Sequence, residues 1–161
     1  MRKLALLACL GLLAACASAP PREASVRPYV VALSVADLDR SIEFYGKHFG
    51  FAEVERLAIP PEGSALAFLA RDGFRIELVQ VTGSVPRVTP DPANDATLRG
   101  LVKLGFAVTE IDALTERLRG AGVPVIVAPF DDTKRGFRGG IVRDPDGNMI
   151  GLYELRVKPA G

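Results

Sequence analysis

Apolar residues recur along the chain with two different spacings, one typical of strands and one typical of helices. In residues 29–35 an apolar side chain occupies every second position, which predicts a strand with one buried face. Asp37 then precedes apolar residues spaced three and four apart, and Gly50 follows them, which predicts a capped helix over 37–49. Further strands are expected at 51–57, 64–70 and 74–80, the last two joined by the turn-forming pair Asp72-Gly73.

The same pattern occurs a second time. Residues 33–39 resemble residues 106–112, 73 positions later, and residues 72–79 resemble residues 146–153, 74 positions later. The repeat predicts a strand at 102–108, a helix over 111–119 that Gly120 closes, and strands at 124–128, 139–143 and 148–155, with Asp146-Gly147 as the second hairpin turn. We therefore expect two tandem βαβββ modules within one domain at 29–157, namely 29–80 and 100–157, joined by a connector at 81–99.

The start of the chain has the pattern of a targeting segment. Arg2 and Lys3 precede an uncharged apolar run over 4–15, which is typical of a signal peptide (residues 1–15) and too short to span a bilayer. The run ends in Leu13-Ala14-Ala15-Cys16, which resembles the lipobox of bacterial lipoproteins. That resemblance implies cleavage before Cys16 and attachment of a lipid to its thiol. The alternative is an ordinary secretory signal cut near Ala19.

The residues after this cysteine extend the same interpretation. Residues 16–28 are rich in Ala, Ser and Pro without periodicity, which predicts an extended tether between lipid and domain. Ser18 is the second residue after Cys16, which by resemblance to lipoproteins of Gram-negative bacteria implies sorting to the outer membrane. We therefore expect a lipid-anchored protein of the cell envelope, on the periplasmic face of the outer membrane, whose partner there is the bilayer.

Charge and composition narrow the possible functions. The chain has 161 residues with 20 Lys and Arg against 19 Asp and Glu, so we expect no nucleic-acid partner. It contains two cysteines, Cys9 and Cys16, and one histidine, His48. This excludes a zinc cluster of cysteines in the domain and any mechanism that needs two histidines.

Three motifs together resemble the vicinal oxygen chelate superfamily, which includes glyoxalase I, extradiol dioxygenases, and fosfomycin and bleomycin resistance proteins. They are Val35-Ala36-Asp37-Leu38, Phe44-Tyr45 with Phe49-Gly50-Phe51, and Asp144-Pro145-Asp146-Gly147-Asn148. The resemblance implies an α+β fold in which the curled mixed sheets of the two βαβββ modules form a cup, with the helices outside. It does not indicate a reaction, because the family includes isomerases, oxygenases, transferases and proteins that only bind.

Metal-dependent members of this family hold a divalent ion with His, Glu or Gln at one position in the first and one in the last strand of each module. The corresponding residues here are Val30 and Glu77 in the first module, and Lys103 and Gly151 in the second. Only Glu77 offers a donor atom for a cation. We therefore expect no metal and no other cofactor, and we do not expect metal-dependent glyoxalase or dioxygenase activity.

Strand alternation predicts which side chains face the cup. Lys103 and Glu77 are expected to form an ion pair where the metal would be, because each would otherwise be a partly buried charge. The predicted ligand-binding residues are Val30, Ser34, Arg75, Glu77, Lys103, Ala107, Met149 and Tyr153.

Other polar features have simpler interpretations. We expect His48 to lie on the surface at the end of the first helix, and Glu154 to point away from the cup. The basic, glycine-rich segment 134–140 is either a solvated hairpin, which is favoured, or a mobile lip over the cup. The carboxylates of 144–147 are interpreted as turn-forming groups without a catalytic role.

Three functions remain open, and the question of enzymatic activity stays undecided. The favoured one is metal-independent binding of a small organic molecule in the cup of a lipid-anchored protein. The second is an enzyme, such as a lyase or isomerase, in which Glu77 acts as a base and Lys103 or Arg75 stabilises an oxyanion. The third is a structural or interaction lipoprotein. The modules could pair within one chain or across a homodimer.

Overall fold

The computed structural model describes residues 26–86 and 99–156. The predicted signal peptide, Cys16, most of the tether 16–28, the middle of the connector 81–99 and residue 157 lie outside the described residues. None of the helices in the described part combines the length and the apolar character needed to cross a membrane.

Module one contains one helix and four strands, as the sequence predicts. They are β1 (Val31–Ser34), α1 (Leu38–Phe49), β2 (Ala52–Ile59), β3 (Ser64–Arg71) and β4 (Phe74–Gln80). Its sheet has the order β1-β4-β3-β2, with β1 parallel to β4 and the other pairs antiparallel.

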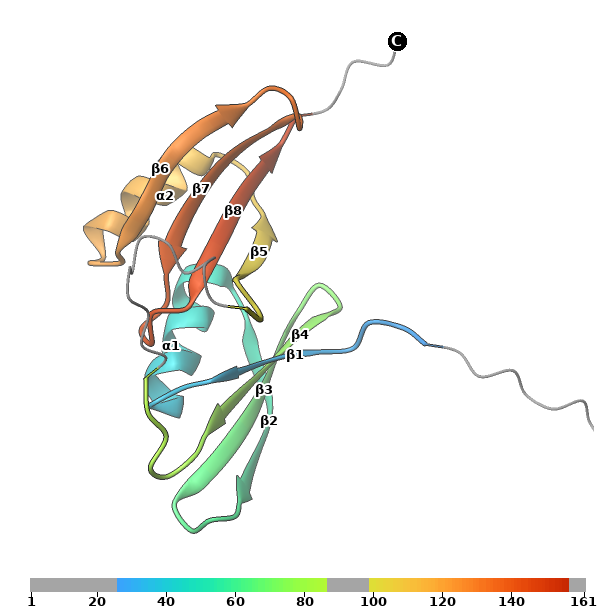
Figure 1. Ribbon diagram of the computed structural model, residues 1–161, viewed down its shortest axis with the longest axis vertical. Helices are drawn as coiled ribbons and strands as arrows, with labels where there is room; N and C mark the ends of the chain where they lie inside the picture. The colour runs from blue at the N-terminus through green and yellow to red at the C-terminus, as the bar shows by residue number, and fades with distance from the viewer. Residues whose placement is uncertain (1–25, 87–98, 157–161) are drawn as a thin grey trace, which may run out of the picture.

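Module two repeats this arrangement. Its elements are β5 (Lys103–Ala107), α2 (Ile111–Gly120), β6 (Val125–Asp132), β7 (Phe137–Arg143) and β8 (Met149–Leu155), with sheet order β5-β8-β7-β6. The two modules follow one another along the long axis of the molecule, as the blue-to-green and yellow-to-red halves of Figure 1 show. The predicted α+β fold of two βαβββ modules is confirmed.

Two element boundaries differ from the prediction for identifiable reasons. Strand β6 continues to Asp132, past the predicted end at residue 128, because a register shift between Val127 and Phe130 accommodates Pro129 on this edge strand. Helix α2 includes Gly120, and the residue that reverses the chain is Gly122, with φ of 81°.

In both modules, the last strand carries a side chain that accepts a hydrogen bond from the first backbone N–H groups of the helix. Asp37 caps α1 by accepting a hydrogen bond from the backbone N–H of Arg40 (2.9 Å). Gln80 at the end of β4 accepts from the N–H of Leu38 (2.7 Å). At the equivalent place in module two, Glu154 of β8 accepts from the N–H groups of Glu110 (3.0 Å) and Ile111 (3.4 Å).

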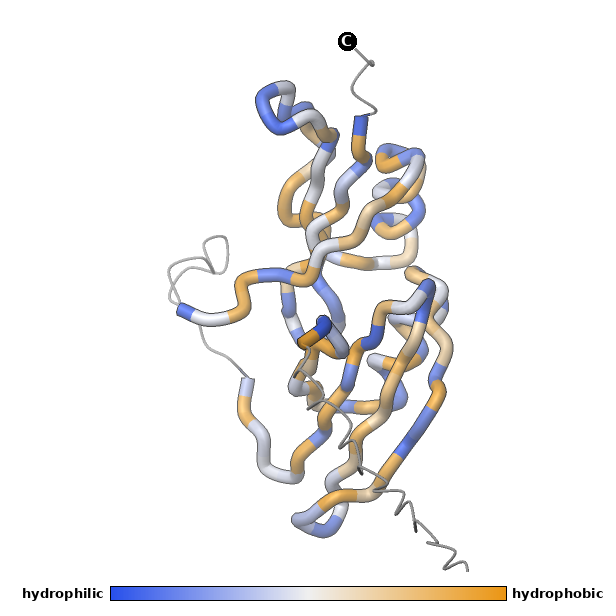
Figure 2. Tube along the Cα trace, turned by 90° about the vertical axis from the view of Figure 1, so that its right-hand side faces the viewer, coloured by the Kyte–Doolittle hydropathy of each residue, from blue (hydrophilic) through white to orange (hydrophobic). Residues whose placement is uncertain are grey.

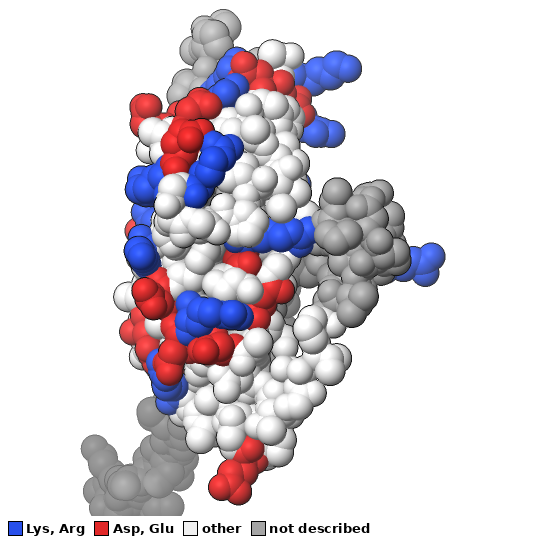
Figure 3. All heavy atoms as spheres, turned by 90° about the vertical axis from the view of Figure 1, so that its left-hand side faces the viewer, with Lys and Arg blue, Asp and Glu red and all other residues white. Residues whose placement is uncertain are grey.

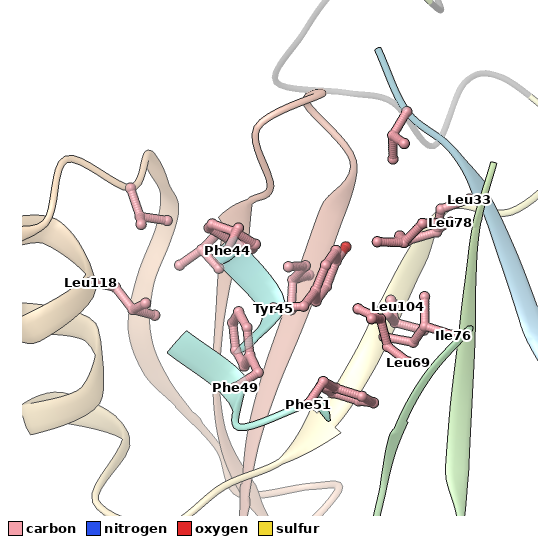
Figure 4. Packing of buried hydrophobic residues seen from close by; sticks show 14 of the residues in the cluster. Leu33, Phe44, Tyr45, Phe49, Phe51, Leu69, Ile76, Leu78, Leu104 and Leu118 are labelled. Atoms are coloured by element: carbon pink, nitrogen blue, oxygen red, sulfur yellow. The ribbon is translucent and has the colours of Figure 1, made fainter. Parts of the chain in front are cut away.

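Both modules contribute to one hydrophobic core, and α1 lies at its centre. Figure 4 shows Phe44, Tyr45 and Phe49 of α1 between the sheet of module one and Leu118 of α2. The ring of Phe106 in β5 lies 5.1 Å from that of Phe49 and 5.6 Å from that of Phe51. Along the strands hydropathy changes repeatedly between apolar and polar (Figure 2), which leaves one face of each sheet for the core and the other open.

The turn between β7 and β8 joins module two to the start of α1. Asp146 accepts hydrogen bonds from the N–H of Ala36 (3.0 Å), the guanidinium of Arg40 (3.0 Å) and the hydroxyl of Ser41 (3.2 Å). The buried hydroxyl of Tyr45 donates to Asp144 (3.0 Å). Burial and the Asp144 carboxylate raise the pKa of Tyr45 far above its ordinary value. We call this contact the closed junction.

The closed junction extends what the sequence predicts for this turn. Asp144 caps the N–H groups of Asp146 (2.9 Å) and Asn148 (2.8 Å), so the predicted turn chemistry is confirmed. The contacts of both carboxylates with module one are not evident from the sequence, because they join residues about a hundred positions apart.

Candidate functional site

The open face of the module-one sheet carries the predicted residues Arg75 and Glu77. They alternate along β4 with the buried Ile76 and Leu78, so their side chains lie on the side away from the core. Glu77 is half-buried, with Ala32 and Phe68 as its neighbours on the adjacent strands. Within the described residues its carboxylate makes no hydrogen bond and no ion pair. The carboxylate is therefore available to a ligand.

Arg75 is held by a residue outside the sheet. Its guanidinium donates to the hydroxyl of Tyr29 (3.0 Å) and lies 5.2 Å from the centre of the Tyr29 ring. Val30, which precedes β1, and Ser34, which ends it, are both exposed. The sheet face thus combines a free carboxylate, a partly engaged guanidinium and exposed apolar groups.

The open face of the module-two sheet is dominated by Tyr153 of β8. Its ring covers Gly105 and Gly151, which pair with each other across β5 and β8. A Cβ atom at Gly151 would lie 2.8 Å from Cε2 and 2.9 Å from the hydroxyl oxygen of Tyr153. Only glycine therefore leaves room for the ring at residue 151.

A second ring completes this surface. Phe137 packs edge-on against Tyr153 with ring centroids 5.1 Å apart, and it lies over Gly139, where a Cβ would be 2.7 Å from the Phe137 ring. The ammonium group of Lys103 lies 5.6 Å from the centre of the Tyr153 ring. Two aromatic rings over three glycines, with one lysine beside them, form the open face of this sheet.

The structure brings the predicted ligand-binding residues together in two separate groups. Arg75 and Glu77 lie in module one, and Lys103 and Tyr153 lie in module two. The predicted ion pair between Lys103 and Glu77 is wrong for this structure, since no ion pair of the described residues joins them. The reason is that Lys103 lies over the ring of a residue on its own sheet.

Two further predicted residues have unexpected surroundings. Met149 is 7% exposed and belongs to the buried part of module two rather than to an open surface. Ala107, at the end of β5, lines cavities between the modules. Sequence alternation assigns both to the correct strand but does not reveal that Met149 is buried or that Ala107 borders a cavity.

The metal positions of the family can be compared with the side chains present. Val30 offers no donor, and Lys103 carries a positive charge. Gly151 lies under the Tyr153 ring, so no longer side chain fits there without displacing that ring. In the part of the chain that the structure describes, no three His, Cys, Asp or Glu side chains gather as a metal site. Among the four side chains at these positions, that of Glu77 carries an oxygen donor for a cation.

The remaining polar predictions agree with simple structural roles. His48 is partly exposed near the end of α1, and burial together with Lys47 and Arg117 lowers its pKa. Segment 134–140 contributes the turn before β7 and the first part of that strand, as the hairpin interpretation requires. Arg138 pairs there with Asp112 (2.8 Å) and Asp131 (3.1 Å). Acidic and basic groups are likewise intermixed on the face seen in Figure 3.

Comparison with known proteins identifies the class of protein. The model of the Glyoxalase/Bleomycin resistance protein/Dioxygenase superfamily matches residues 28–152. The chain belongs to this family.

Solved structures support the same assignment. A glyoxalase/bleomycin resistance protein/dioxygenase domain from Frankia sp. EAN1pec is 25% identical, with a TM-score of 0.66 over 86% of this chain and 96% of that one. The trypanothione-dependent glyoxalase I of Leishmania major is 25% identical, with a TM-score of 0.63 over 81% and 87%. A glyoxalase family protein from Enterococcus faecalis, 21% identical with a TM-score of 0.67 over 80% and 97%, shares the fold. No protein of curated function matches the chain.

Sequence reasoning missed the aromatic surface of module two. The signal for it was present, because Gly105, Gly139 and Gly151 lie inside predicted strands, where glycine often marks the close approach of another group. The identity of that group follows only from the register, which places Tyr153 opposite Gly139 on β7 and Ala107 on β5.

Proposed function

We propose that this chain is a lipid-anchored member of its family that binds a small organic molecule on the open faces of its two sheets without a metal ion. The observation that carries the proposal is the donor set at the four metal positions. Only Glu77 could bind a cation, while the Tyr153 ring covers Gly151. A single carboxylate does not hold a catalytic transition metal, which usually needs three protein ligands.

The side chains on these faces suggest the class of ligand. Tyr153 and Phe137 provide stacking surfaces, and Lys103 beside them provides a positive charge. Glu77 and Arg75 provide a hydrogen-bond acceptor and a donor on the other sheet. A flat or partly apolar molecule with polar substituents of both kinds would match this combination.

We further propose that two copies of the chain complete the cup. Among the described residues, the edge strands β1 and β5 each have a hydrogen-bonded neighbour on one side only, β4 and β8 respectively. Exposed apolar residues lie beside both edges, among them Val30, Leu101 and Val102. Light scattering of the purified protein should give twice the mass of one chain, and a monomer at all concentrations would contradict this part of the proposal.

The envelope location rests on the sequence. We propose that Cys16 carries the lipid and that the domain lies on the periplasmic face of the outer membrane. Replacing Cys16 by Ser should release the protein from the membrane fraction and abolish incorporation of labelled palmitate. A Cys9→Ser variant serves as the control, because Cys9 lies within the segment that is removed.

A specific observation also supports a second candidate, an enzyme that uses Glu77 as a base. A catalytic base must be free of a permanent ion pair, and the Glu77 carboxylate has no such partner in the described part of the chain. Lys103 or Arg75 would stabilise the oxyanion formed when a substrate loses a proton. Arg75 lies on the same face of β4 as Glu77, whereas Lys103 lies on the other sheet, so Arg75 is the better candidate within one chain.

A ligand screen followed by one substitution tests the proposal. Full-length protein stripped of metal is screened by thermal shift against small aromatic acids and amides, and the best hit is measured again with Glu77→Gln. A binder should lose affinity about tenfold at most, whereas an enzyme should lose turnover of the hit. Glu62→Gln, in the exposed turn before β3, is the matched control. Absence of any hit, or a stoichiometric transition metal whose loss abolishes binding, would refute metal-independent binding.

A further inference from the structure

Two neighbouring cavities lie between the modules. A cavity of about 640 Å³ lies where the end of α1 and Arg71 approach the start of α2. A second cavity of about 340 Å³ adjoins it. Both are lined by Phe49, Arg71, Ala107 and Val108, so they are direct neighbours. We call the two cavities together the open junction.

The internal repeat explains why this space exists. The closed junction places the β7–β8 turn of module two against the start of α1. The repeat predicts the reciprocal contact, with the β3–β4 turn of module one against the start of α2. Asp72 is the counterpart of Asp146, but its side chain is 86% exposed, whereas that of Asp146 is 12% exposed. Asp72 instead pairs with Arg71 (3.1 Å).

The residues that hold the closed junction are missing at the open one. Arg40, Ser41 and Tyr45 of α1 correspond to three apolar residues of α2, and Asp144 corresponds to Ala70. These positions of α2 therefore offer the Asp72 carboxylate no side-chain hydrogen-bond donor, and the open junction is not filled by the β3–β4 turn. The three apolar counterparts are Ala113, Leu114 and Leu118.

The two ends of the open junction differ in chemistry. At the smaller cavity, the rings of Phe49, Phe51, Phe74 and Phe106 form an aromatic wall, with Phe74 and Phe106 centred 6.5 Å apart. Phe74 is 43% exposed, so this wall is open to an incoming group. An aromatic or aliphatic body would bury apolar surface here.

At the larger cavity, positive groups predominate. Arg71 and Arg117 line it from opposite modules, with His48 nearby and one carboxylate, that of Glu110. Arg117 lies one helical turn beyond Ala113 and Leu114, on the same face of α2. Its guanidinium has no ion pair within the described residues. A carboxylate entering this end would meet one free guanidinium and one already bound to Asp72 and the carbonyl oxygen of Phe49.

We propose that the open junction is a second binding site, which takes an organic anion with an apolar body. The carboxylate lies between Arg117 and Arg71, and the apolar body lies against the four phenylalanine rings. This site differs from the proposed one on the open sheet faces, because Glu77, Lys103 and Tyr153 do not line it, although Gly105 and Ala107 border both.

The probe that tests this proposal is 4-phenylbutyrate. Uncharged 4-phenylbutan-1-ol, which lacks the carboxylate, is the control compound. Amide chemical shifts of the full-length, ¹⁵N-labelled protein are followed during each titration. We expect 4-phenylbutyrate to move the amides of Val108, Thr109 and Leu114 in a saturable way. Arg117→Gln should weaken binding about tenfold, because the carboxylate loses a charge-assisted hydrogen bond.

Matched variants separate this site from general effects. Arg119→Gln changes an exposed arginine of the same helix that pairs with Glu116 outside the cavity, so binding should be unchanged. Ala113→Phe should block the cavity and abolish the shifts while the circular dichroism spectrum stays native. The proposal would be overturned if the alcohol bound with the same affinity as the acid, or if Arg117→Gln left the affinity for the acid unchanged. The absence of any saturable shift at the open junction would also overturn it. Shifts confined to residues 75–79 or 151–153 would overturn it too, and would instead support the proposed ligand on the sheet faces.

Discussion

The two junctions between the modules derive from one repeated pattern, yet one is held by hydrogen bonds and the other encloses a cavity. At the closed junction, polar residues of α1 meet the carboxylates of the β7–β8 turn. At the open junction, apolar residues of α2 face a turn whose aspartate points to solvent. The difference teaches that duplication preserves the backbone of both modules, while a few side chains decide whether a contact between them forms.

The same lesson applies to the sheets. Glu77 and Gly151 are equivalent positions in the last strands of the two modules. One is a half-buried carboxylate without a partner among the described residues, and the other lies under an aromatic ring. Each module has kept its hydrogen-bonding pattern and changed the chemistry of its open face.

The largest effect should come from removing the carboxylate at the centre of the closed junction. Asp146→Ala leaves the buried hydroxyl of Ser41 and the N–H of Ala36 without their acceptor, and should lower the free energy of unfolding by about 2–3 kcal/mol. Asp72→Ala, its exposed counterpart, should change it by about 0.5 kcal/mol or less. Urea denaturation measures both. Equal effects of the two substitutions would show that the junctions do not differ in energy.

A smaller effect is expected on the open face of module two. Gly151→Ala places a methyl group within about 3 Å of the Tyr153 ring, which must move, and the cost should be about 1–2 kcal/mol. In the background of Tyr153→Ala the same substitution should cost much less, as a double-mutant cycle of thermal unfolding would reveal. If the free-energy changes of the two substitutions were additive, the Tyr153 ring would not be in contact with residue 151.

The hydroxyl of Tyr45 should contribute about 1–2 kcal/mol, because it donates to a buried carboxylate. Tyr45→Phe removes that contribution and should lower the urea midpoint. The pH dependence provides a second measurement. Since folding raises the pKa of Tyr45, its contribution is complete below the ordinary value of 10.0 and is lost as pH rises above it. Wild type should lose more stability than Tyr45→Phe between pH 10 and pH 11, and parallel curves would contradict this assignment.

The smallest effect should be a gain. Thr115 of α2 corresponds to Ile42 of α1, and its buried hydroxyl has no hydrogen-bond partner in the part of the chain described. Thr115→Val keeps the shape and removes the unpaired group, so unfolding should become harder by about 0.5–1 kcal/mol. Differential scanning calorimetry would detect the shift. A loss of stability would mean that the hydroxyl is hydrogen-bonded in solution.

The fold was predictable because its signals are local. Apolar–polar alternation, helix caps and the two Asp-Gly turns depend on residues close in sequence. The internal repeat also predicts the same elements independently in each module. The extent of β6 was not predictable in this way, since pairing with β7 continues the strand past Pro129.

The site was predictable only in part, because some of its contacts are not local in sequence. Strand parity correctly placed Glu77 and Arg75 on an open face, because that needs only the period of two. Which groups touch depends on how the modules pack. Lys103 therefore lies over Tyr153 instead of meeting Glu77, and Ala107 lines the open junction.

The position of Asp146 has a consequence for how the chain matures during synthesis. Ser41 and its acceptor are 105 residues apart. At ordinary translation speeds the first helix leaves the ribosome about 5 to 20 s before the aspartate that completes its first turn. The start of the first helix consequently gains this contact only after the carboxy-terminal half has been synthesised. An isolated amino-terminal fragment that ends in the connector would lack the contact.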